Sequence, residues 1–364
     1  MLLRELRLKD FRNYEELTLS FEKGANIFFG SNGQGKTNLL EAISLLSVGR
    51  SFRTTRDADM IAFGREDANV IADTCSDKGE YSIDIKLGKK IKKAVKINSI
   101  PIDKLQELFG VINVVVFSPD DLKLIKDGPK ERRLFLDREI SQIRPRYYRV
   151  LSDYYKVLQR RNLLLKEEGP SMMVDIYTEQ LAQFGYEVMD MRRTFLEEIC
   201  TIAKDIHRTI SSGKEELNVE YEANVSASTS QEYLDVLRDA KEQDVLKGNT
   251  TRGIHRDDIA LKIGEMDIRH FGSQGQKRSA AISLKLSEIA LMHQLFDEYP
   301  IVLLDDIFSE LDPSRQKMLL EYVKDTQVFL TTAEPFEFEG RVFRVEEGRI
   351  VHMERGLKED SIVE

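Results

Sequence analysis

Gly30-Ser31-Asn32-Gly33-Gln34-Gly35-Lys36-Thr37 is the stretch that decides the fold of this 364-residue chain. It matches the pattern GxxxxGK(S/T), in which glycines let backbone N–H groups surround the phosphates of a nucleotide. An apolar run at Ala25 to Phe29 precedes it as a strand would, and the amphipathic stretch Asn38 to Ser47 follows it as a helix would. The N-terminus of that helix would add partial positive charge beside the phosphates. The sequence therefore predicts an α/β protein with a phosphate-binding loop.

Separate roles follow for the residues of this loop and for an acidic pair later in the chain. We expect Lys36 to contact the β and γ phosphates and the Thr37 hydroxyl to ligate Mg²⁺. The apolar run Ile301 to Leu304 ends in Asp305 and Asp306, and two carboxylates at the end of a buried strand are costly unless a cation neutralises them. We assign Asp305 to the metal, partly through water, and Asp306 to orienting or deprotonating the attacking water. No NKxD pattern follows, so ATP is the expected nucleotide, and its other predicted contacts are Gly30, Ser31, Asn32, Gly33, Gln34, Gly35 and Asn38.

The composition is that of a globular protein, with 41% hydrophobic and 32% charged residues. No apolar run approaches the roughly 18 residues that a membrane span needs. The segment Arg4 to Lys9 carries four charges where a secretory leader would need an apolar core. We therefore expect a cytoplasmic protein without membrane contact. Cys75 and Cys200 lie far apart, which predicts neither a disulfide framework nor a cysteine zinc site.

The spacing of the apolar residues divides the chain into regions of predicted strands and a region of predicted helices. Short segments before Phe117 have the composition of strands, several with alternation. Apolar residues then recur every three or four positions from Leu136 to Leu158 and again from Phe184 to Ile210, which is the helical period. Strands return from about Ile254, and the last ones are expected at 301–305, 327–331 and 341–345. The simplest arrangement is an α/β domain at 1–129 and 250–364, interrupted by a mainly helical insertion at 130–249.

The net charge of −9 argues against indiscriminate binding to nucleic acid, because phosphate neutralisation needs clustered Lys and Arg. Two such clusters exist. Residues 132–166 carry ten basic against three acidic residues, and residues 86–96 carry six Lys and no acid. Either cluster fits a solvated face or a DNA-binding stripe. On charge alone, the candidate DNA contacts are Arg50, Arg53, Arg56, Lys89, Lys90, Lys92 and Lys93.

A second polar motif, Phe271-Gly272-Ser273-Gln274-Gly275-Gln276, opens an apolar helix about 30 residues before Asp305. Its order and spacing resemble the ABC-type ATPase class, whose signature motif caps the phosphates that a partner subunit binds. The resemblance implies an ABC-type P-loop ATPase head with mixed sheets, interrupted by a helical arm. It also implies that Ser273, Gln274 and Gly275 contact the nucleotide of a second copy, Ser273 as a catalytic residue beside Lys36 and Asp306. Ser309 to Asp312 resembles the D-loop of the same class.

The chain is most similar to the RecF family of bacterial recombination mediators, which act at gapped DNA. The segments that carry the resemblance are LRLKDFRNY (6–14), GSNGQGKTNLLEAI (30–43), GRSFRT (49–54), FSPDDLKLIKDGPKERRLFLD (117–137), QRRNLLLK (159–166), GIHRDD (253–258), FGSQGQKR (271–278) and LLDDIFSELD (303–312). The resemblance implies an ATP-dependent homodimer, weak DNA-stimulated ATP hydrolysis and a preference for double-stranded DNA at gaps. It also implies action with RecR, and with RecO as a further candidate partner, to help load RecA.

Two departures from the general ABC pattern imply slow hydrolysis. Phe117 to Asp120 stands where the class has a glutamine that contacts the metal and water, and Thr331-Thr332 stands where it has a histidine. ATP would then close the dimer rather than drive a continuous motor.

Three other functions share some of these motifs. An SMC-like clamp that bridges DNA would need neither RecR nor RecO, but the insertion is short and lacks a CxxC hook. A P-loop kinase would leave the signature-like and D-loop-like motifs without a role. An ABC transporter subunit would not explain the RecF-like segments outside the nucleotide site.

Overall fold

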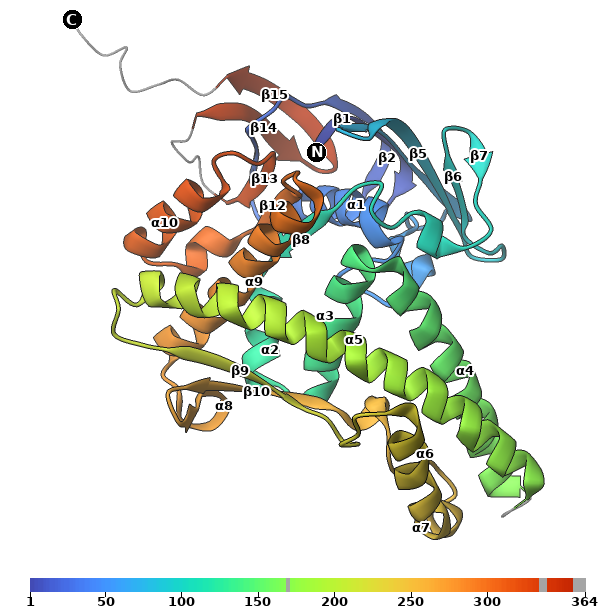
Figure 1. The fold of residues 1–364 in the computed structure, drawn as a ribbon. Coiled ribbons are helices and arrows are strands. Elements are labelled where there is room, and N and C mark those ends of the chain that lie inside the picture. Colours follow the sequence, from blue (N-terminus) through green and yellow to red (C-terminus); the bar gives the residue numbers. More distant parts are fainter. Residues whose placement is uncertain (168–170, 334–338, 356–364) are drawn as a thin grey trace, which may run out of the picture. The chain divides into compact units, whose positions relative to one another are not determined.

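The computed structural model describes residues 1–167, 171–333 and 339–355, with the backbone alone described for 353–355. The chain forms two compact units (Figure 1). Unit 1 comprises residues 1–121 and 288–364, and unit 2 comprises residues 122–287. The divisions therefore fall at 121/122 and 287/288, whereas the sequence places them at 129/130 and 249/250. The assignment of the units as head and arm stays a prediction.

Unit 1 contains the parallel sheet that the phosphate loop requires. Its six strands lie in the order β15-β14-β3-β13-β12-β8, and all neighbours are parallel except β14 and β15. Four of them are short and almost wholly buried, as expected for a parallel sheet covered on both faces. The strands are β3 (Ala25–Phe29), β8 (Val114–Phe117), β12 (Ile301–Asp305), β13 (Val328–Thr332), β14 (Gly340–Glu346) and β15 (Arg349–Arg355).

A second, antiparallel sheet completes unit 1, with strand order β2-β1-β4-β5-β6-β7. Gln327 joins the two sheets, because its side chain accepts from the Leu3 N–H at 2.7 Å and donates to the Leu3 carbonyl at 2.9 Å. The strands are β1 (Leu2–Phe11), β2 (Tyr14–Ser20), β4 (Asp67–Ser76), β5 (Gly79–Gly88), β6 (Ala94–Ile97) and β7 (Ile100–Pro101). The helices and turns of unit 1 are α1 (Lys36–Val48), α10 (Pro313–Val323), η1 (Asp57–Met60), η2 (Leu105–Glu107), η3 (Pro119–Asp121) and η5 (Ile307–Glu310).

Unit 2 is mainly helical, as its 3.6-residue period predicts. The helices α4 (Pro145–Glu167) and α5 (Met172–Ile210) pack side by side along their length (Figure 1). Pro145 begins a new helix after α3 (Pro129–Ile143), since proline is tolerated in the first turn of a helix but not in its interior. The other helices are α2 (Leu122–Lys126), α6 (Ser230–Asp239), α7 (Lys241–Lys247), α8 (Ile268–Phe271), η4 (Ile254–Arg256) and the first part of α9 (Gln274–Phe296). No helix in the described part of the chain is both long and apolar enough to cross a membrane.

A small sheet explains why unit 2 extends past residue 249. Strand β9 (Leu217–Glu222) lies inside the predicted helical insertion and pairs along its length with β10 (Asp258–Ile263). The two-residue strand β11 (Met266–Asp267) adds to the other edge. Because β10 completes this sheet, residues 250–267 belong with the helices rather than with the nucleotide-binding unit.

Part of the basic run at 132–166 is internal rather than on the surface. Arg132 and Arg161 are buried, so the interpretation of the run as a solvated or DNA-binding face is wrong for these two residues. Arg132 forms a bidentate pair with Asp258 at 2.6 and 2.8 Å, and Arg161 donates to Asp244 at 2.7 Å. A buried guanidinium must be matched by carboxylates, and here both partners come from beyond residue 240.

Candidate nucleotide site

The phosphate loop connects the end of β3 to the start of α1, as its sequence predicts. Helix α1 begins at Lys36, two residues earlier than expected, and no acidic side chain occupies its first turn. The Tyr14 hydroxyl donates to the Gly35 carbonyl at 3.1 Å. The Asn13 side-chain amide donates to the Gln34 carbonyl at 2.9 Å. The loop therefore takes its shape from hydrogen bonds with the turn between β1 and β2 as well as from its own glycines.

Lys36 lies within the curve of the loop. Its ammonium donates to the Gly30 carbonyl and, at 2.9 Å, to the Ser31 carbonyl, and the residue is buried. Burial lowers the pKa of Lys36, while Asp306 and Asp305 oppose that shift. The two aspartates thus help to keep a buried ammonium charged at the point where a nucleotide's phosphates would lie.

The acidic pair lies at the carboxyl end of β12 and contacts the residue after Lys36. The Thr37 hydroxyl donates to Asp305 Oδ1 at 2.8 Å, and the Thr331 hydroxyl donates to the same oxygen at 2.8 Å. Thr331 also accepts from the Asp306 N–H at 2.9 Å. Burial raises the pKa of Asp305, and the Thr37 and Thr331 hydrogen bonds oppose it. The structure thus brings Lys36, Thr37, Asp305 and Asp306 together at the carboxyl ends of β12 and β13.

Thr331 is a site residue that sequence reasoning missed in this role. The sequence marks it only as a residue that stands where the ABC class has a histidine. Its hydroxyl instead links the two aspartates, which fixes the orientation of the Asp305 carboxylate relative to the backbone of Asp306. The available signal was the register of two neighbouring parallel strands, in which Thr331 is the direct partner of Asp305.

The turn between β14 and β15 supports the loop from the side. The N–H of Glu347 donates to Gln34 Oε1 at 2.7 Å, and the N–H of Gly348 donates to the Gln34 carbonyl at 3.0 Å. Gly348 has a φ of +72°, and a Cβ there would overlap the Asn13 carbonyl. Only glycine therefore lets the hairpin approach this closely.

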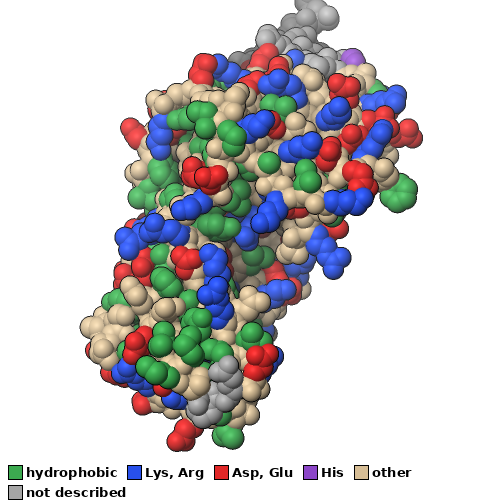
Figure 2. Space-filling view, turned by 90° about the vertical axis from the view of Figure 1, so that its right-hand side faces the viewer, with side chains coloured by type: hydrophobic (Ala, Val, Ile, Leu, Met, Phe, Trp, Pro, Cys, Tyr) green, Lys and Arg blue, Asp and Glu red, His purple; other side chains and the backbone are tan. Residues whose placement is uncertain are grey.

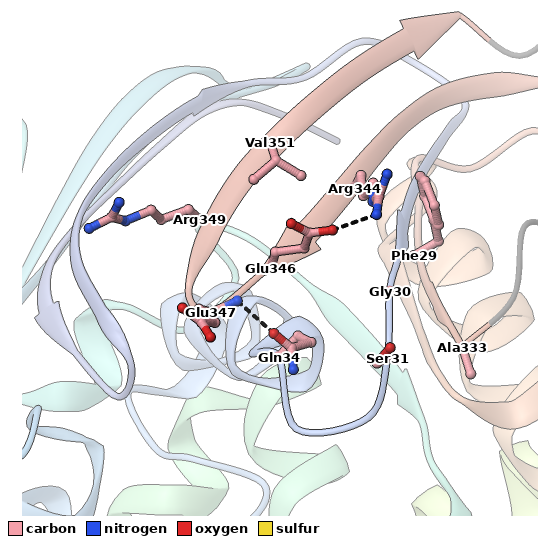
Figure 3. A pocket seen from close by; sticks show the side chains of 10 residues that line it. All are labelled: Phe29, Gly30, Ser31, Gln34, Ala333, Arg344, Glu346, Glu347, Arg349 and Val351. Carbon is pink, nitrogen blue, oxygen red and sulfur yellow. Dashed lines mark hydrogen bonds and ion pairs between the residues drawn. The ribbon is translucent and has the colours of Figure 1, made fainter.

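A cavity of about 670 Å³ opens between the phosphate loop and this hairpin (Figure 3). That volume is within the range of small-molecule sites. Its walls combine the apolar Phe29 and Val351 with an ion pair, Arg344 to Glu346 at 2.6 Å. A ligand in the cavity would contact Gly30, Ser31 and Gln34 of the phosphate loop, and its remaining lining residues are Ala333, Glu347 and Arg349.

A buried carboxylate on α1, that of Glu41, pairs with two arginines. Arg12 forms a bidentate pair with Glu41, both distances being 2.7 Å, and Glu41 is fully buried. Arg53 donates to Asn38 Oδ1 at 2.8 Å and lies 3.5 Å from Glu41. Burial raises the pKa of Asp305, and the charge of Arg53 is among the effects that oppose this rise. Arg53 thus lies beside the nucleotide site, while its role as a DNA contact stays a prediction, and Arg12 is a second residue that sequence reasoning missed.

The signature-like motif lies in unit 2, outside the unit that holds the loop and the acidic pair. Ser273 precedes α9 directly, as expected, and is exposed, as is Gln274, while Gly275 is half-buried. In unit 1, the D-loop-like segment ends at Asp312, which caps α10 by accepting from the Arg315 N–H at 3.2 Å. Each motif thus occupies the helix end or turn that its sequence predicts.

The remaining predicted DNA contacts belong to unit 1. Lys93 is largely buried, pairs with Asp57 at 2.8 Å and donates to the Gly49 carbonyl at 2.6 Å, so its ammonium is held within unit 1, and its role as a DNA contact stays a prediction. On the face shown in Figure 2, basic side chains lie among acidic ones. Among the predicted contacts, Lys90 pairs with Glu66 at 3.2 Å. The predicted DNA contacts whose residues are exposed are Arg50, Arg53, Arg56, Lys89, Lys90 and Lys92.

Replacing Gly30 by alanine tests the close packing of the loop. Gly30 has a φ of +150°, and a Cβ would overlap the Val345 carbonyl, which the parallel sheet holds in place. We expect Gly30→Ala to lower the free energy of unfolding by roughly 2–4 kcal/mol, through overpacking and backbone strain. Gly33→Ala is the matched control, because its φ is +81° but the space around it is open. It should cost about 1 kcal/mol. Equal losses for both variants in urea unfolding would contradict this packing.

Comparison with known proteins identifies the family. The family model described as RecF/RecN/SMC N terminal domain matches residues 2–346. The DNA replication and repair protein RecF of Clostridioides difficile (strain 630) is 41% identical over 98% of this chain and 100% of its own length. That of Alkaliphilus oremlandii (strain OhILAs) is 45% identical over 91% and 93%. A solved structure of the recombination mediator protein RecF with ATP, in the RecFOR pathway, superposes with a TM-score of 0.90 at 34% identity over 97% of each chain.

A more distant structure shares the fold alone. The Smc head domain from Pyrococcus furiosus superposes with a TM-score of 0.53 at 19% identity, over 96% of this chain and 94% of that one. The fold and the site therefore define an ABC-type P-loop ATPase head. The chain belongs to the RecF family of DNA replication and repair proteins.

Proposed function

We propose that this protein is an ATP-dependent, DNA-binding recombination mediator of the cytoplasm. ATP would drive two copies into a homodimer that binds double-stranded DNA at gaps or junctions. It would then act with RecR, with RecO as a further candidate partner, to help load RecA. The observation that carries the proposal is the convergence of Lys36, Thr37 and Asp305 in one unit, with a signature-like helix start in the other.

ATP is supported by the solved RecF structure with ATP and by the loop itself. Lys36 and the loop N–H groups would hold the phosphates. The Thr37 hydroxyl oxygen and the Asp305 carboxylate are 2.8 Å apart, and both are oxygen donors of the kind that Mg²⁺ prefers. Burial raises the pKa of Asp305 because it disfavours the charged carboxylate. A bound cation would neutralise that charge. Bound Mg²⁺ would supply charge stabilisation to the transferred phosphoryl group.

Dimerisation is supported by the exposure of the signature-like motif. Ser273 presents a hydroxyl at the N-terminus of the 23-residue helix α9, where the partial positive charge of the helix attracts phosphate. We expect this end to cap the γ-phosphate of ATP bound by the second copy. Hydrolysis should be slow, well below the median enzyme turnover of about 10 s⁻¹.

DNA binding would rest on phosphate contacts from the exposed basic residues. Such contacts carry little sequence preference. The logarithm of the binding constant should fall by about 0.9 per contact for each logarithmic unit of salt. An SMC-like clamp that bridges DNA is the second candidate function, and the shared head fold favours it. It differs in needing no RecR or RecO.

Sedimentation of three variants tests the proposal. Wild type, Lys36→Arg and Ser273→Arg are compared with and without ATP and a gapped duplex. We expect ATP to convert the wild type from monomer to dimer, and DNA to co-sediment with the dimer. Ser273→Arg should bind ATP but stay monomeric, because the bulky side chain blocks the cap without touching the phosphate loop. Lys36→Arg should bind ATP weakly and stay monomeric.

The contrary outcomes are distinct. A wild type that stays monomeric with ATP and DNA would exclude the trans-capped dimer and favour a P-loop enzyme that acts within one chain. If Ser273→Arg dimerises as readily as the wild type, Ser273 does not cap the nucleotide of the second copy. Bridging of two duplexes that RecR and RecO do not alter would favour the SMC-like clamp.

A further inference from the structure

The start of α9 is shaped by a reciprocal pair of hydrogen bonds. The N–H of Gln276 donates to the Ser273 hydroxyl oxygen at 3.2 Å. The N–H of Ser273 donates to Gln276 Oε1 at 2.8 Å. This is a capping box, which fixes the position of the first residue relative to the first turn of the helix. The signature serine is therefore held through the Gln276 side chain.

The same side chain has a third contact outside the motif. Gln276 Nε2 donates to Glu215 Oε1 at 2.9 Å, a contact across 61 residues of sequence. A carboxylate accepts only from the nitrogen side of the amide, so Glu215 fixes which way the Gln276 amide faces. With that orientation, Oε1 faces the Ser273 N–H. Without it, the amide is free to rotate and the capping box loses one of its two bonds.

Glu215 is in turn held by the end of the long helix α5. Its N–H donates to the hydroxyl of Ser211, the residue that caps α5, at 3.2 Å. Glu215 Oε2 lies 3.3 Å from Nε2 of His207, which is fully buried in the last turn of α5. The other ring nitrogen of His207 lies 3.0 Å from the Ser283 hydroxyl on α9. Both the backbone and the carboxylate of Glu215 are thus tied to α5.

We propose that Glu215 is a positioning residue for the signature motif, acting through Gln276. It holds the Gln276 amide in the orientation that places Ser273, and it links that placement to the C-terminal end of α5. This inference rests on the proposed trans-capping by Ser273. Loss of the Glu215 carboxylate leaves the phosphate loop intact, because the loop belongs to unit 1. It weakens only the step in which the signature of one copy meets the nucleotide of the other.

The test is a comparison of Glu215→Ala with Glu216→Ala by sedimentation in ATP. Glu216 is the adjacent glutamate, is exposed and pairs with Lys204 at 2.5 Å, so its loss does not reach the motif. We expect Glu215→Ala to raise the dimer dissociation constant about tenfold, because the freed Gln276 amide must be ordered again at both signature motifs when the dimer forms. The ATP affinity of the monomer should be unchanged. Glu216→Ala should match the wild type in both measurements.

Two further variants separate positioning from a general structural role. Glu215→Gln keeps an oxygen that accepts from Gln276 and should recover most of the dimer affinity. In a Gln276→Ala background, adding Glu215→Ala should change the dissociation constant less than twofold, since Glu215 acts through Gln276. Full additivity of the two substitutions would overturn the proposal, as would an unaltered dimer in Glu215→Ala. If Ser273→Arg also leaves the dimer unaltered, the trans-capping itself is wrong. If Ser273→Arg abolishes the dimer while Glu215→Ala does not, only the role of Glu215 is wrong.

Discussion

Asp306→Asn is expected to lower ATP turnover by about 10²–10³-fold while leaving ATP-dependent dimerisation in place. A carboxylate that orients or deprotonates the attacking water contributes roughly 10²–10⁴-fold to a rate, and an amide cannot accept the proton. Asparagine is the suitable replacement, because Asp306 has a φ of 49° and a ψ of 27°, in the left-handed region. Asparagine adopts that conformation readily, whereas alanine would add strain of its own.

Phosphate release under single-turnover conditions measures the effect, and sedimentation in ATP measures the dimer. The backbone contact from the Asp306 N–H to the Thr331 hydroxyl, at 2.9 Å, does not depend on the side chain and should persist in the variant. Asp305→Asn is the comparison, since it should also weaken nucleotide binding through the loss of a metal ligand. A turnover within threefold of the wild type in Asp306→Asn would mean that another group orients the water.

Arg192→Met is expected to remove about 3–5 kcal/mol from the free energy of unfolding. Arg192 is fully buried on α5, where it donates to Asp257 at 2.9 Å and to Asp137 at 2.8 Å. It also donates to the Tyr147 hydroxyl and the Ile254 carbonyl, both at 2.9 Å. Burial raises the pKa of Asp257 and Arg192 opposes that shift, so removing the guanidinium leaves a buried carboxylate without its cation.

Urea unfolding followed by circular dichroism measures the loss. Arg193→Met is the matched control, because Arg193 is the next residue of the same helix, is 39% exposed and lies 3.7 Å from Asp190. A partly exposed pair of this kind contributes about 0–1 kcal/mol. Adding Asp257→Asn to Arg192→Met should recover part of the stability, since it removes the unmatched charge. Similar losses for Arg192→Met and Arg193→Met would show that the buried cluster does not determine stability.

The nucleotide-binding elements could be predicted from sequence because their signals are local. The apolar run at 25–29 coincides with β3, and the run ending at Asp305 coincides with β12. The strands expected at 327–331 and 341–345 became β13 and β14 with shifts of one residue at the ends. Each signal is a short buried strand beside turn residues, which the pattern of apolar residues reports directly.

The parts that sequence reasoning missed depend on contacts between distant residues. The sequence does not predict strand β9 within the helical insertion, because its pairing partner β10 lies 36 residues further along the chain. Arg132 and Arg161 are buried, but the sequence predicts surface charge for them because no neighbouring residue indicates burial. The ion pairs that Glu41 forms with Arg12 and Arg53 likewise join separate segments, and the spacing of apolar residues gives no sign of them.

The order of the strands in unit 1 has a consequence for folding during synthesis. Strand β3 pairs with β13 and β14 and with no strand made before residue 300. At about 5–20 residues per second, the ribosome takes roughly 15–60 s to deliver those partners after β3 has emerged. Unit 2 is continuous in sequence from 122 to 287, so it can fold within that interval. The newly made chain therefore holds an apolar strand without its sheet for most of its synthesis, and chaperones have that window in which to bind it.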